Sequence, residues 1–259
     1  MLYFTPGPSA LYPTVREHII TALDSGLPSL SHRSEAFQVL VMEAVQGIRS
    51  LLKLPDDYSV YFMSSATEVM ERVLQNSVGQ YSGHLVNGAF SSRLAELAEM
   101  LDLIVVRHEV GWGEAFDSLP NFDSGVELIT VVHNETSTGV MTPVDYIYNL
   151  AAAFPESLLV VDIVSSIPVV ELDFSKIDVG YFLVQKGLGL PSGLAVVIVS
   201  PRAIEAEQRV TVKRGTYRCW SALKKYADKY QTQETSNILN IYLLGKVLAD
   251  MEAQGWQEK

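Results

Sequence analysis

The sequence predicts an α/β protein in which a mainly parallel sheet is covered by helices on both faces, giving three layers. Seven short runs rich in apolar and β-branched residues recur along the chain, and segments with helical spacing separate most of them. Strands that are apolar nearly throughout are typical of parallel sheets that are buried on both faces. The chain has 259 residues, 48% of them hydrophobic, which is enough for one large domain of this class.

The elements can be placed from this alternation. Two helices precede the first strand, and a long helix follows the last one. The predicted strands are 60–63, 84–86, 103–107, 127–132, 158–161, 179–184 and 194–199, and the predicted helices are 14–23, 35–53, 67–78, 91–101, 143–153 and 236–251. The last two strands are joined only by residues 185–193, too few for the crossover helix of a parallel pair. We therefore expect a seven-stranded sheet with one antiparallel edge strand.

The composition argues against several classes of protein. A formal net charge of −11 does not suit a general binder of nucleic acid or of anionic membranes. The apolar runs are far too short to span a bilayer, and the first residues lack the basic start and apolar core of a signal peptide. The single cysteine, Cys219, leaves no internal disulfide and suits a reducing compartment, so we expect a soluble cytoplasmic protein. The five histidines show no paired ligand spacing, and no metal site is predicted.

Lys186 and Asp162 are the candidate catalytic residues. Lys186 follows the apolar run 179–184 and enters a Gly-rich turn, where burial can lower the pKa of its ammonium and favour Schiff-base chemistry. Asp162 follows another apolar strand, 158–161. A lysine that binds an aldehyde and an aspartate that protonates a pyridine nitrogen are the two groups that pyridoxal phosphate needs. The alternative for the lysine alone is a strand end that simply reaches water.

Polar or aromatic residues follow the other strands as well, and in parallel sheets these positions share one edge, where ligands bind. Ser65 and its neighbours can bind an anion at the start of a helix, or can cap that helix with no ligand. Phe90 brings an aromatic ring to the same edge. The polar loop 133–139 either contributes to the site or only forms a turn before the next helix.

A series of motifs, taken in order, resembles one enzyme family. The motifs are TPGP at 5–8, SHRS at 31–34, SSATEVME at 64–71, NGAF at 87–90, HNETSTG at 133–139, DIVSS at 162–166, QKG at 185–187 and QETSN at 233–237. Together they resemble class V, fold-type-I pyridoxal-phosphate aminotransferases, most of all the phosphoserine and alanine–glyoxylate (serine–pyruvate) aminotransferase group. The match nearly spans the chain and implies the large domain of a pyridoxal-phosphate-dependent transferase.

The resemblance implies a role for each matching residue. Lys186 would bind the cofactor aldehyde and then act as the base that moves the proton between the substrate Cα and the cofactor, while Asp162 would pair with the ring nitrogen. The implied cofactor contacts are ring packing by Phe90 and Val164, a hydrogen bond from Thr136 to the phenolic oxygen, and phosphate binding by Ser65, the amides of Ala66 and Thr67, and Gln185.

The resemblance also implies partners. Thr235 matches a position that reaches the phosphate of the neighbouring subunit, so a homodimer with shared active sites is expected. Gly7, His32 and Arg33 match segments near the substrate, and Arg33 could receive an anionic group. The implied reaction is transamination between a small amino acid, of the serine, phosphoserine or alanine type, and a 2-oxo acid.

The sequence departs from the family pattern in two ways. Thr67 stands where phosphoserine aminotransferases tend to have an arginine, which argues against recognition of a substrate phosphate. Family members also carry a C-terminal small domain with a carboxylate-binding arginine, which 259 residues do not supply. We therefore expect a fragment with an N-terminal arm and helix at 1–30, a cofactor-binding large domain at 31–235, and a long helix at 236–259 leading to the missing domain.

Other functions remain open on the sequence alone. A cysteine desulfurase-like or β-eliminating lyase would use the same cofactor, although Cys219 is expected to pack as a small hydrophobic residue. A non-catalytic alternative is a phosphate- or cofactor-binding module, or a scaffold kept for dimerisation.

Overall fold

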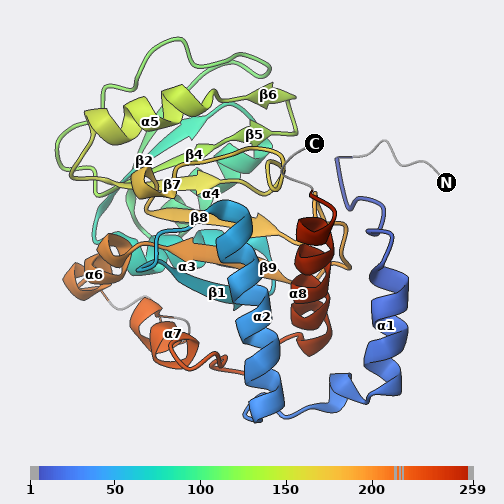
Figure 1. The fold of residues 1–259 in the computed structure, drawn as a ribbon. Coiled ribbons are helices and arrows are strands. Elements are labelled where there is room, and N and C mark those ends of the chain that lie inside the picture. The colour runs from blue at the N-terminus through green and yellow to red at the C-terminus, as the bar shows by residue number, and fades with distance from the viewer. Residues whose placement is uncertain (1–5, 213–214, 216, 218, 256–259) are drawn as a thin grey trace.

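The computed structural model describes residues 6–212, 215, 217 and 219–255, and these form three layers around a central sheet (Figure 1). The seven strands lie in the order β1-β9-β8-β7-β4-β2-β3. Their bounds are β1 Ser59–Met63, β2 Tyr81–Val86, β3 Ile104–Glu109, β4 Leu128–Val132, β7 Leu158–Asp162, β8 Val179–Leu183 and β9 Ala195–Val199. All seven predicted strands are confirmed. The small hairpin of β5 (Asn134–Glu135) and β6 (Val140–Met141), which was not predicted, lies outside this sheet.

The antiparallel strand is β9, which pairs antiparallel with both β8 and β1. The short connection between β8 and β9 correctly predicted that the chain reverses direction after β8. The antiparallel strand was also predicted to lie at the edge of the sheet, and this was wrong, because β1 lies outside it. The outer backbone groups of β9 need a partner, and β1 supplies it from more than a hundred residues earlier in the chain. β1 therefore runs in the same direction as β8.

Each face of the sheet has its own helices. One face is covered by α1 (Val15–Asp24), α2 (Glu35–Leu52), α5 (Val144–Ala153) and α8 (Ile238–Ala253), and the other by α3 (Ala66–Ser77), α4 (Ala89–Met100), α6 (Pro201–Arg209) and α7 (Trp220–Ala227). Two short 3-10 helices, η1 (Leu27–Ser29) and η2 (Phe174–Lys176), complete the described elements. The six predicted helices are confirmed, whereas α6 and α7 were not predicted.

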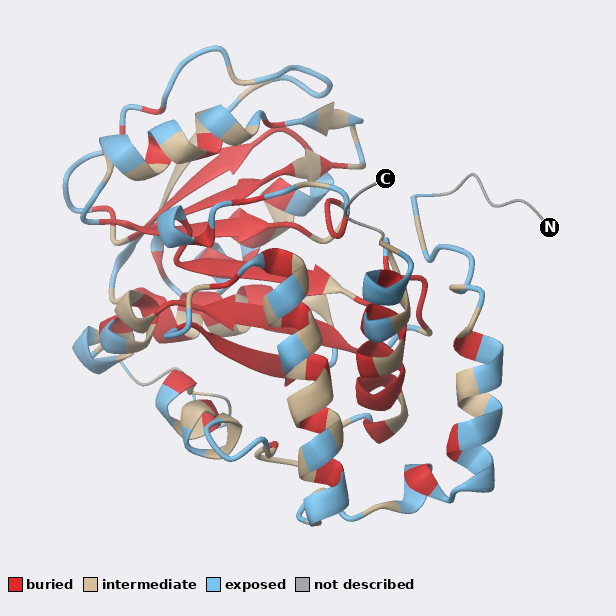
Figure 2. Ribbon diagram, viewed as in Figure 1, coloured by how far each residue is buried: buried red, intermediate tan, exposed pale blue. Residues whose placement is uncertain are grey.

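The core follows the period-two alternation of the strands. In β1, Val60 and Phe62 join the apolar cluster under α2 and α8, while Tyr61 and Met63 join the cluster under α3 and α7. The sheet is accordingly buried along most of its length, and the helices are exposed on their outer sides (Figure 2). No helix in the described part of the chain is long and apolar enough to cross a membrane.

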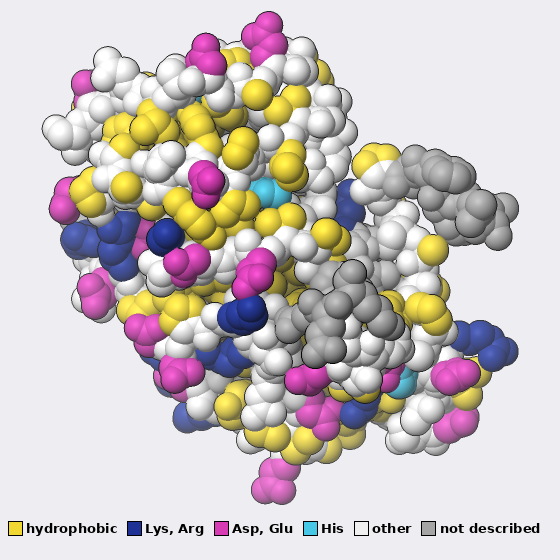
Figure 3. Space-filling view, turned by 45° about the horizontal axis from the view of Figure 1, so that its top comes forward, with side chains coloured by type: hydrophobic (Ala, Val, Ile, Leu, Met, Phe, Trp, Pro, Cys, Tyr) yellow, Lys and Arg dark blue, Asp and Glu magenta, His cyan; other side chains and the backbone are white. Residues whose placement is uncertain are grey.

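The surface charge is spread out on the face drawn in Figure 3, where acidic side chains are scattered with basic ones between them. The formal net charge of −11 is therefore not concentrated in one patch on this face.

Candidate functional site

The predicted polar positions gather at one edge of the sheet. The strands β2, β4, β7 and β8 are parallel, and β1 runs with them, so the residues that follow all five strands meet at their carboxyl ends. Met63 and Leu183 both pair with Ala195, which places the loop after β1 beside the loop after β8. The edge predicted for ligand binding is therefore assembled from strands that are distant in sequence.

Asp162 ends β7 and is buried, with only 5% of its surface exposed. Its Oδ1 accepts a hydrogen bond from the backbone N–H of Val164 (2.9 Å), and its Oδ2 accepts one from the hydroxyl of Tyr181 (2.8 Å). Burial raises the pKa of the Asp162 carboxyl to about 6, although both hydrogen bonds act to lower it. No ion pair of Asp162 occurs among the described residues, so this is a buried carboxylate without a cation in contact.

Lys186 lies just beyond the end of β8 and is close enough to Asp162 for each charge to affect the pKa of the other. Burial lowers the pKa of the Lys186 ammonium, and the negative charge of Asp162 partly opposes that shift. A lysine that loses its proton more easily than usual is a better nucleophile and base near neutral pH.

The N-terminal arm lies directly on Lys186. The ammonium donates a hydrogen bond to the carbonyl oxygen of Pro6 (2.7 Å), and the hydroxyl of Ser9 donates to the carbonyl oxygen of Lys186 (2.5 Å). Gly7 has a φ of +131°, a conformation that favours glycine, and a Cβ atom there would lie 2.5 Å from Lys186 Cδ and 2.7 Å from Nζ, so glycine allows this close approach. The structure thus places Gly7, a predicted substrate residue, next to the candidate lysine. Thr5, the first residue of the quoted motif, lies outside the described residues.

The start of α3 offers donors for an anion. Ser65 is the N-cap residue, and its Oγ accepts a hydrogen bond from the N–H of Glu68 (3.2 Å). The next N–H, that of Val69, donates to the carbonyl oxygen of Ser65. The N–H groups of Ala66 and Thr67 have no hydrogen bond within the part of the chain that is described. Free amides at a helix start, reinforced by the helix dipole, are what a phosphate requires.

Phe90 lies in the first turn of α4, which is capped by a side chain from the β5–β6 hairpin. The fully buried carboxylate of Glu135 accepts hydrogen bonds from the N–H groups of Phe90 (3.1 Å) and Ser91 (2.9 Å). The N-cap residue Gly88 has no side chain, and a Cβ there would lie 2.4 Å from Glu135 Cγ. Phe90 is 43% exposed, which leaves it accessible to a flat ligand. Thr136 follows Glu135 in the same hairpin and is half-buried.

Three of the predicted residues form a separate group. The guanidinium of Arg33 donates to the carbonyl oxygens of Thr232 (2.6 Å) and Gln233 (3.0 Å), and His32 Nδ1 lies 3.1 Å from the hydroxyl of Thr235. No hydrogen bond or ion pair joins His32, Arg33 or Thr235 to Lys186 or Asp162 within the described ranges. Arg33 therefore serves here to hold the segment that precedes α8.

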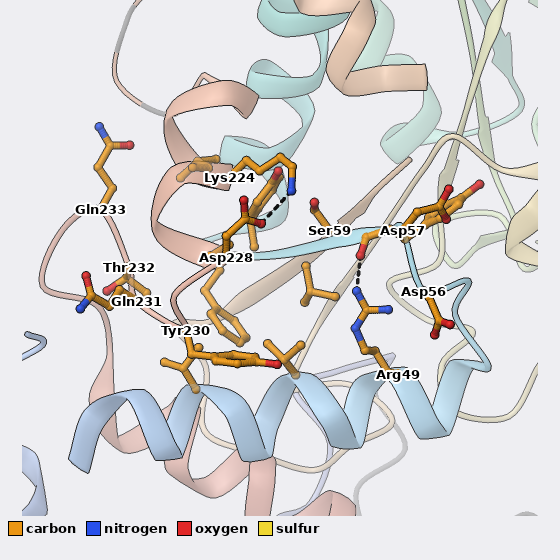
Figure 4. A pocket seen from close by; sticks show the side chains of 18 of the residues that line it. Arg49, Asp56, Asp57, Ser59, Lys224, Asp228, Tyr230, Gln231, Thr232 and Gln233 are labelled. Atoms are coloured by element: carbon orange, nitrogen blue, oxygen red, sulfur yellow. Dashed lines mark hydrogen bonds and ion pairs between the residues drawn. The ribbon is translucent and has the colours of Figure 1, made fainter. Parts of the chain in front are cut away.

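A cavity of about 490 Å³ lies elsewhere, between α2, α7 and the start of β1 (Figure 4). Both basic side chains that line it have partners: Lys224 Nζ lies 2.7 Å from Asp228 Oδ1, and the guanidinium of Arg49 donates to the carbonyl oxygens of Pro55 and Tyr58. This cavity adjoins the amino end of β1, away from the loop that follows Met63. None of the residues predicted for the site around Lys186 lines this cavity, so it has no part in that site.

Sequence reasoning assigned no role to Tyr181 or Glu135, although both hold predicted site residues in place. Tyr181 stands in the correctly predicted strand before Lys186, and Glu135 stands inside the quoted motif 133–139. The alternation of side chains along β8 could have shown which residues of this strand share a face of the sheet with Tyr181. No sequence signal gives the pairing that sets its hydroxyl beside Asp162.

Comparison with known proteins identifies a family and close relatives. The family model described as aminotransferase class V matches residues 2–259. An uncharacterized aminotransferase of Methanocaldococcus jannaschii is 30% identical over 257 residues, which cover 95% of this chain and 65% of that protein. A phosphoserine aminotransferase of Nocardioides sp. is also 30% identical, over 97% of this chain and 68% of the relative. The chain thus spans about two thirds of the length of these curated relatives.

Solved structures agree with this result. The crystal structure of a phosphoserine aminotransferase from Cytophaga hutchinsonii matches with a TM-score of 0.93 and 44% sequence identity, covering 97% of this chain and 71% of that chain. The resemblance drawn from the motifs is confirmed by these matches.

Proposed function

This chain belongs to the class-V aminotransferases, and on that premise we propose that it binds pyridoxal phosphate and moves an amino group between a small amino acid and a 2-oxo acid. One observation carries the proposal: a lysine with a lowered pKa and a buried carboxylate without a cation in contact interact at the ligand-binding edge of the sheet. When bound, pyridoxal phosphate supplies an aldehyde that reacts with amines and a pyridinium ring that withdraws electrons from the bonds to Cα.

The residues at this edge fit the cofactor. The buried side-chain oxygen of Gln185 has no hydrogen-bond partner among the described residues, and neither do the backbone N–H groups of Ala66 and Thr67. Unpaired polar groups in a site are satisfied when a ligand arrives. With the hydroxyl of Ser65 and the amides of α3, the Gln185 side chain would bind the phosphate by donating from its Nε2, because a phosphate accepts hydrogen bonds. The carboxylate of Asp162 would gain the cation that its buried position lacks when it meets a protonated ring nitrogen.

The remaining roles follow from position. Lys186 Nζ would bind the cofactor aldehyde and later hold and move the proton at Cα, for which a lowered pKa is an advantage. Phe90 and Val164 would pack against the two ring faces, and Thr136 would hydrogen-bond the phenolic oxygen. Gly7 would line the substrate position, since it already touches Lys186.

The substrate and the partners are proposed from the family. We propose an amino donor of the serine, phosphoserine or alanine type. We also propose a homodimer in which Thr235 reaches the cofactor phosphate bound in the partner subunit. His32 and Arg33 would then act near the substrate by holding the 232–235 segment, because the Arg33 guanidinium already binds two carbonyl oxygens there. We propose a cytoplasmic location, which the single cysteine of the sequence supports because one cysteine forms no internal disulfide.

The test is chemical labelling. The purified protein is incubated with pyridoxal phosphate, reduced with borohydride and digested, and the labelled peptide should contain Lys186. Lys186→Ala should abolish the label and the turnover, whereas Lys176→Ala, which removes an exposed lysine paired with Asp173, should change neither. A label on another peptide, or an active Lys186→Ala variant, would refute the proposal. Spectra recorded with serine, phosphoserine, alanine and glutamate would then identify the donor.

A further inference from the structure

Tyr181 and Asp162 are direct neighbours across the sheet. They pair in the parallel register between β7 and β8, so their side chains project from the same face. The Tyr181 hydroxyl donates a hydrogen bond of 2.8 Å to Asp162 Oδ2, and the tyrosine side chain is fully buried. A backbone hydrogen bond also joins the two strands at this point, because the N–H of Ile163 donates to the carbonyl oxygen of Tyr181 (3.1 Å). Both the main chain and the side chain of Tyr181 therefore hold the residues at the end of β7.

The Asp162 carboxylate is held from two sides. Its second oxygen, Oδ1, accepts from the N–H of Val164 (2.9 Å), a backbone donor from the loop after β7. One donor on each oxygen fixes the plane of the carboxylate and prevents its rotation. Burial and the neighbouring charge of Asp162 raise the pKa of the Tyr181 hydroxyl well above its usual value, so the hydroxyl keeps its proton and remains a donor.

We propose that Tyr181 is a positioning residue of the active site, whose hydroxyl fixes the orientation of the Asp162 carboxylate and favours its ionised form. The inference rests on the proposed function, because it makes the carboxylate ready for a protonated ring nitrogen. A hydrogen bond donated to a carboxylate stabilises the charged form over the neutral one. It therefore acts in the same direction as the charge of Lys186 and opposes burial and the charge of Glu135, which both raise the Asp162 pKa and favour a neutral acid.

The consequence is measurable without any cofactor. With a pKa of about 6, Asp162 is mostly ionised at pH 7. Loss of one charge-assisted hydrogen bond should raise this pKa by about one pKa unit or more, which would leave roughly half of the carboxylates protonated at pH 7. Pairing with a ring nitrogen would then require a higher pH.

Tyr181→Phe tests the idea because it removes the hydroxyl and keeps the buried ring. The protein is labelled with 13C at the aspartate carboxyl carbons, and the Asp162 signal is assigned by its loss in Asp162→Asn. We expect the titration midpoint of Asp162 in the cofactor-free protein to rise by about one pH unit in Tyr181→Phe. The midpoint of the pH dependence of pyridoxal phosphate binding should rise with it.

The matched control is Tyr61→Phe. Tyr61 lies on β1 in the same apolar cluster, is only 3% exposed, and has its hydroxyl 3.4 Å from the carbonyl oxygen of Trp220 rather than beside Asp162. Removing its hydroxyl should leave the Asp162 midpoint unchanged. Equal shifts in the two variants would mean that loosened packing is the cause, and the proposal would be overturned. An unchanged midpoint in Tyr181→Phe would overturn it as well.

A second variant covers the case in which Tyr181→Phe does not fold. Replacement of Tyr181 by 3-fluorotyrosine makes the hydroxyl a stronger donor at nearly the same size, so the Asp162 midpoint should fall instead of rise; a midpoint that stays or rises contradicts the proposal. These titrations need no cofactor, so their result is separate from the labelling of Lys186. A shifted midpoint with no label at Lys186 would reject the proposed function alone.

Discussion

The Asp162 carboxylate is buried without a cation in contact, and this arrangement costs the cofactor-free protein stability. The pKa of this carboxyl is about 6 in the folded chain, against 3.8 for the exposed group. Between these values the folded chain retains a proton that the unfolded chain has lost. Stability therefore falls as the pH rises through this interval, and the full loss, about 3 kcal/mol, is present above about pH 6.

Replacing Asp162 by asparagine should remove that cost. We expect cofactor-free Asp162→Asn to be more stable than the parent protein by about 2 kcal/mol at pH 8 and no more stable at pH 4, because the penalty exists only when the unfolded carboxyl is ionised. Urea unfolding at the two pH values measures the difference.

Asp178→Asn is the matched control for this experiment. Asp178 is also buried, but its Oδ2 lies 2.8 Å from the guanidinium of Arg202, and its Oδ2 also accepts from the N–H of Leu159. That variant should lose stability at pH 8, since it leaves a guanidinium without its counter-ion. If Asp162→Asn were also destabilised at pH 8, the argument about its buried charge would fail.

Lys186 and Asp162, the proposed catalytic pair, could be singled out from sequence because Asp162 ends one apolar strand and Lys186 closely follows another. Their partners could not. Tyr181 reaches Asp162 only through the β7–β8 register, and Glu135 reaches the start of α4 only through a hairpin of two-residue strands. The sequence suggested that the Arg33 side chain could receive an anionic group. In the structure its guanidinium instead donates to the carbonyl oxygen of Gln233, 200 residues away. Contacts between distant elements carry no local signature.

At the scale of elements, α2 and α8 approach closely because glycines lie at their interface. A Cβ at Gly47 of α2 would lie 2.9 Å from Leu248 Cβ of α8, and a Cβ at Gly245 would lie 3.3 Å from the backbone nitrogen of Ala44. A helix with alanine in place of glycine is intrinsically more stable by about 1 kcal/mol. The packing overrides that preference, because Leu248 Cβ is attached to the helix and cannot swing away.

Gly47→Ala should therefore destabilise the protein by about 1 to 2 kcal/mol despite the gain in helix propensity. The measurement is chemical unfolding of Gly47→Ala, Leu248→Gly, which removes the opposing Cβ, and the double variant, in which the two losses should sum to more than the observed loss. Gly125→Ala, where an added Cβ meets nothing within 4 Å, is the control and should be nearly neutral. A stabilised Gly47→Ala would show that the helices can separate at little cost.

Length, rather than periodicity, separates the helices that were predicted from those that were not. The predicted helices have ten residues or more, whereas α6 and α7 have nine and eight and follow one another after the last strand. Ser200 followed by Pro201 is a helix-start signal that could have identified α6, since Ser200 Oγ accepts from the N–H of Ala203 (3.1 Å). Cys219, the N-cap residue of α7, makes no side-chain cap and offered no such signal.

At the scale of the whole molecule, α8 shares the core of the sheet. Ile241, Leu243, Leu244 and Val247 are fully buried, and they belong to the same apolar cluster as strand residues such as Phe182. The α1 helix is attached to α8 as well, through Asp250, whose carboxylate accepts from the hydroxyl of Thr14 (2.6 Å). The boundary predicted at 235/236 stays a prediction, and this packing provides a way to test it.

A chain that ends at Asn237 lacks α8 and would expose the apolar residues of α2 and the sheet that this helix covers. Burying a large apolar side chain stabilises a protein by about 1.5 to 3 kcal/mol, and α8 buries several such side chains. Their summed contribution exceeds the free energy of unfolding of a typical domain. We therefore expect the shortened chain to lose its cooperative unfolding transition, as followed by circular dichroism and calorimetry. A chain that ends at Gly255 keeps all of α8 and should unfold like the parent. If the chain ending at Asn237 kept a sharp transition at the parental midpoint, α8 would contribute little to stability, and the sheet with its other helices would fold without it.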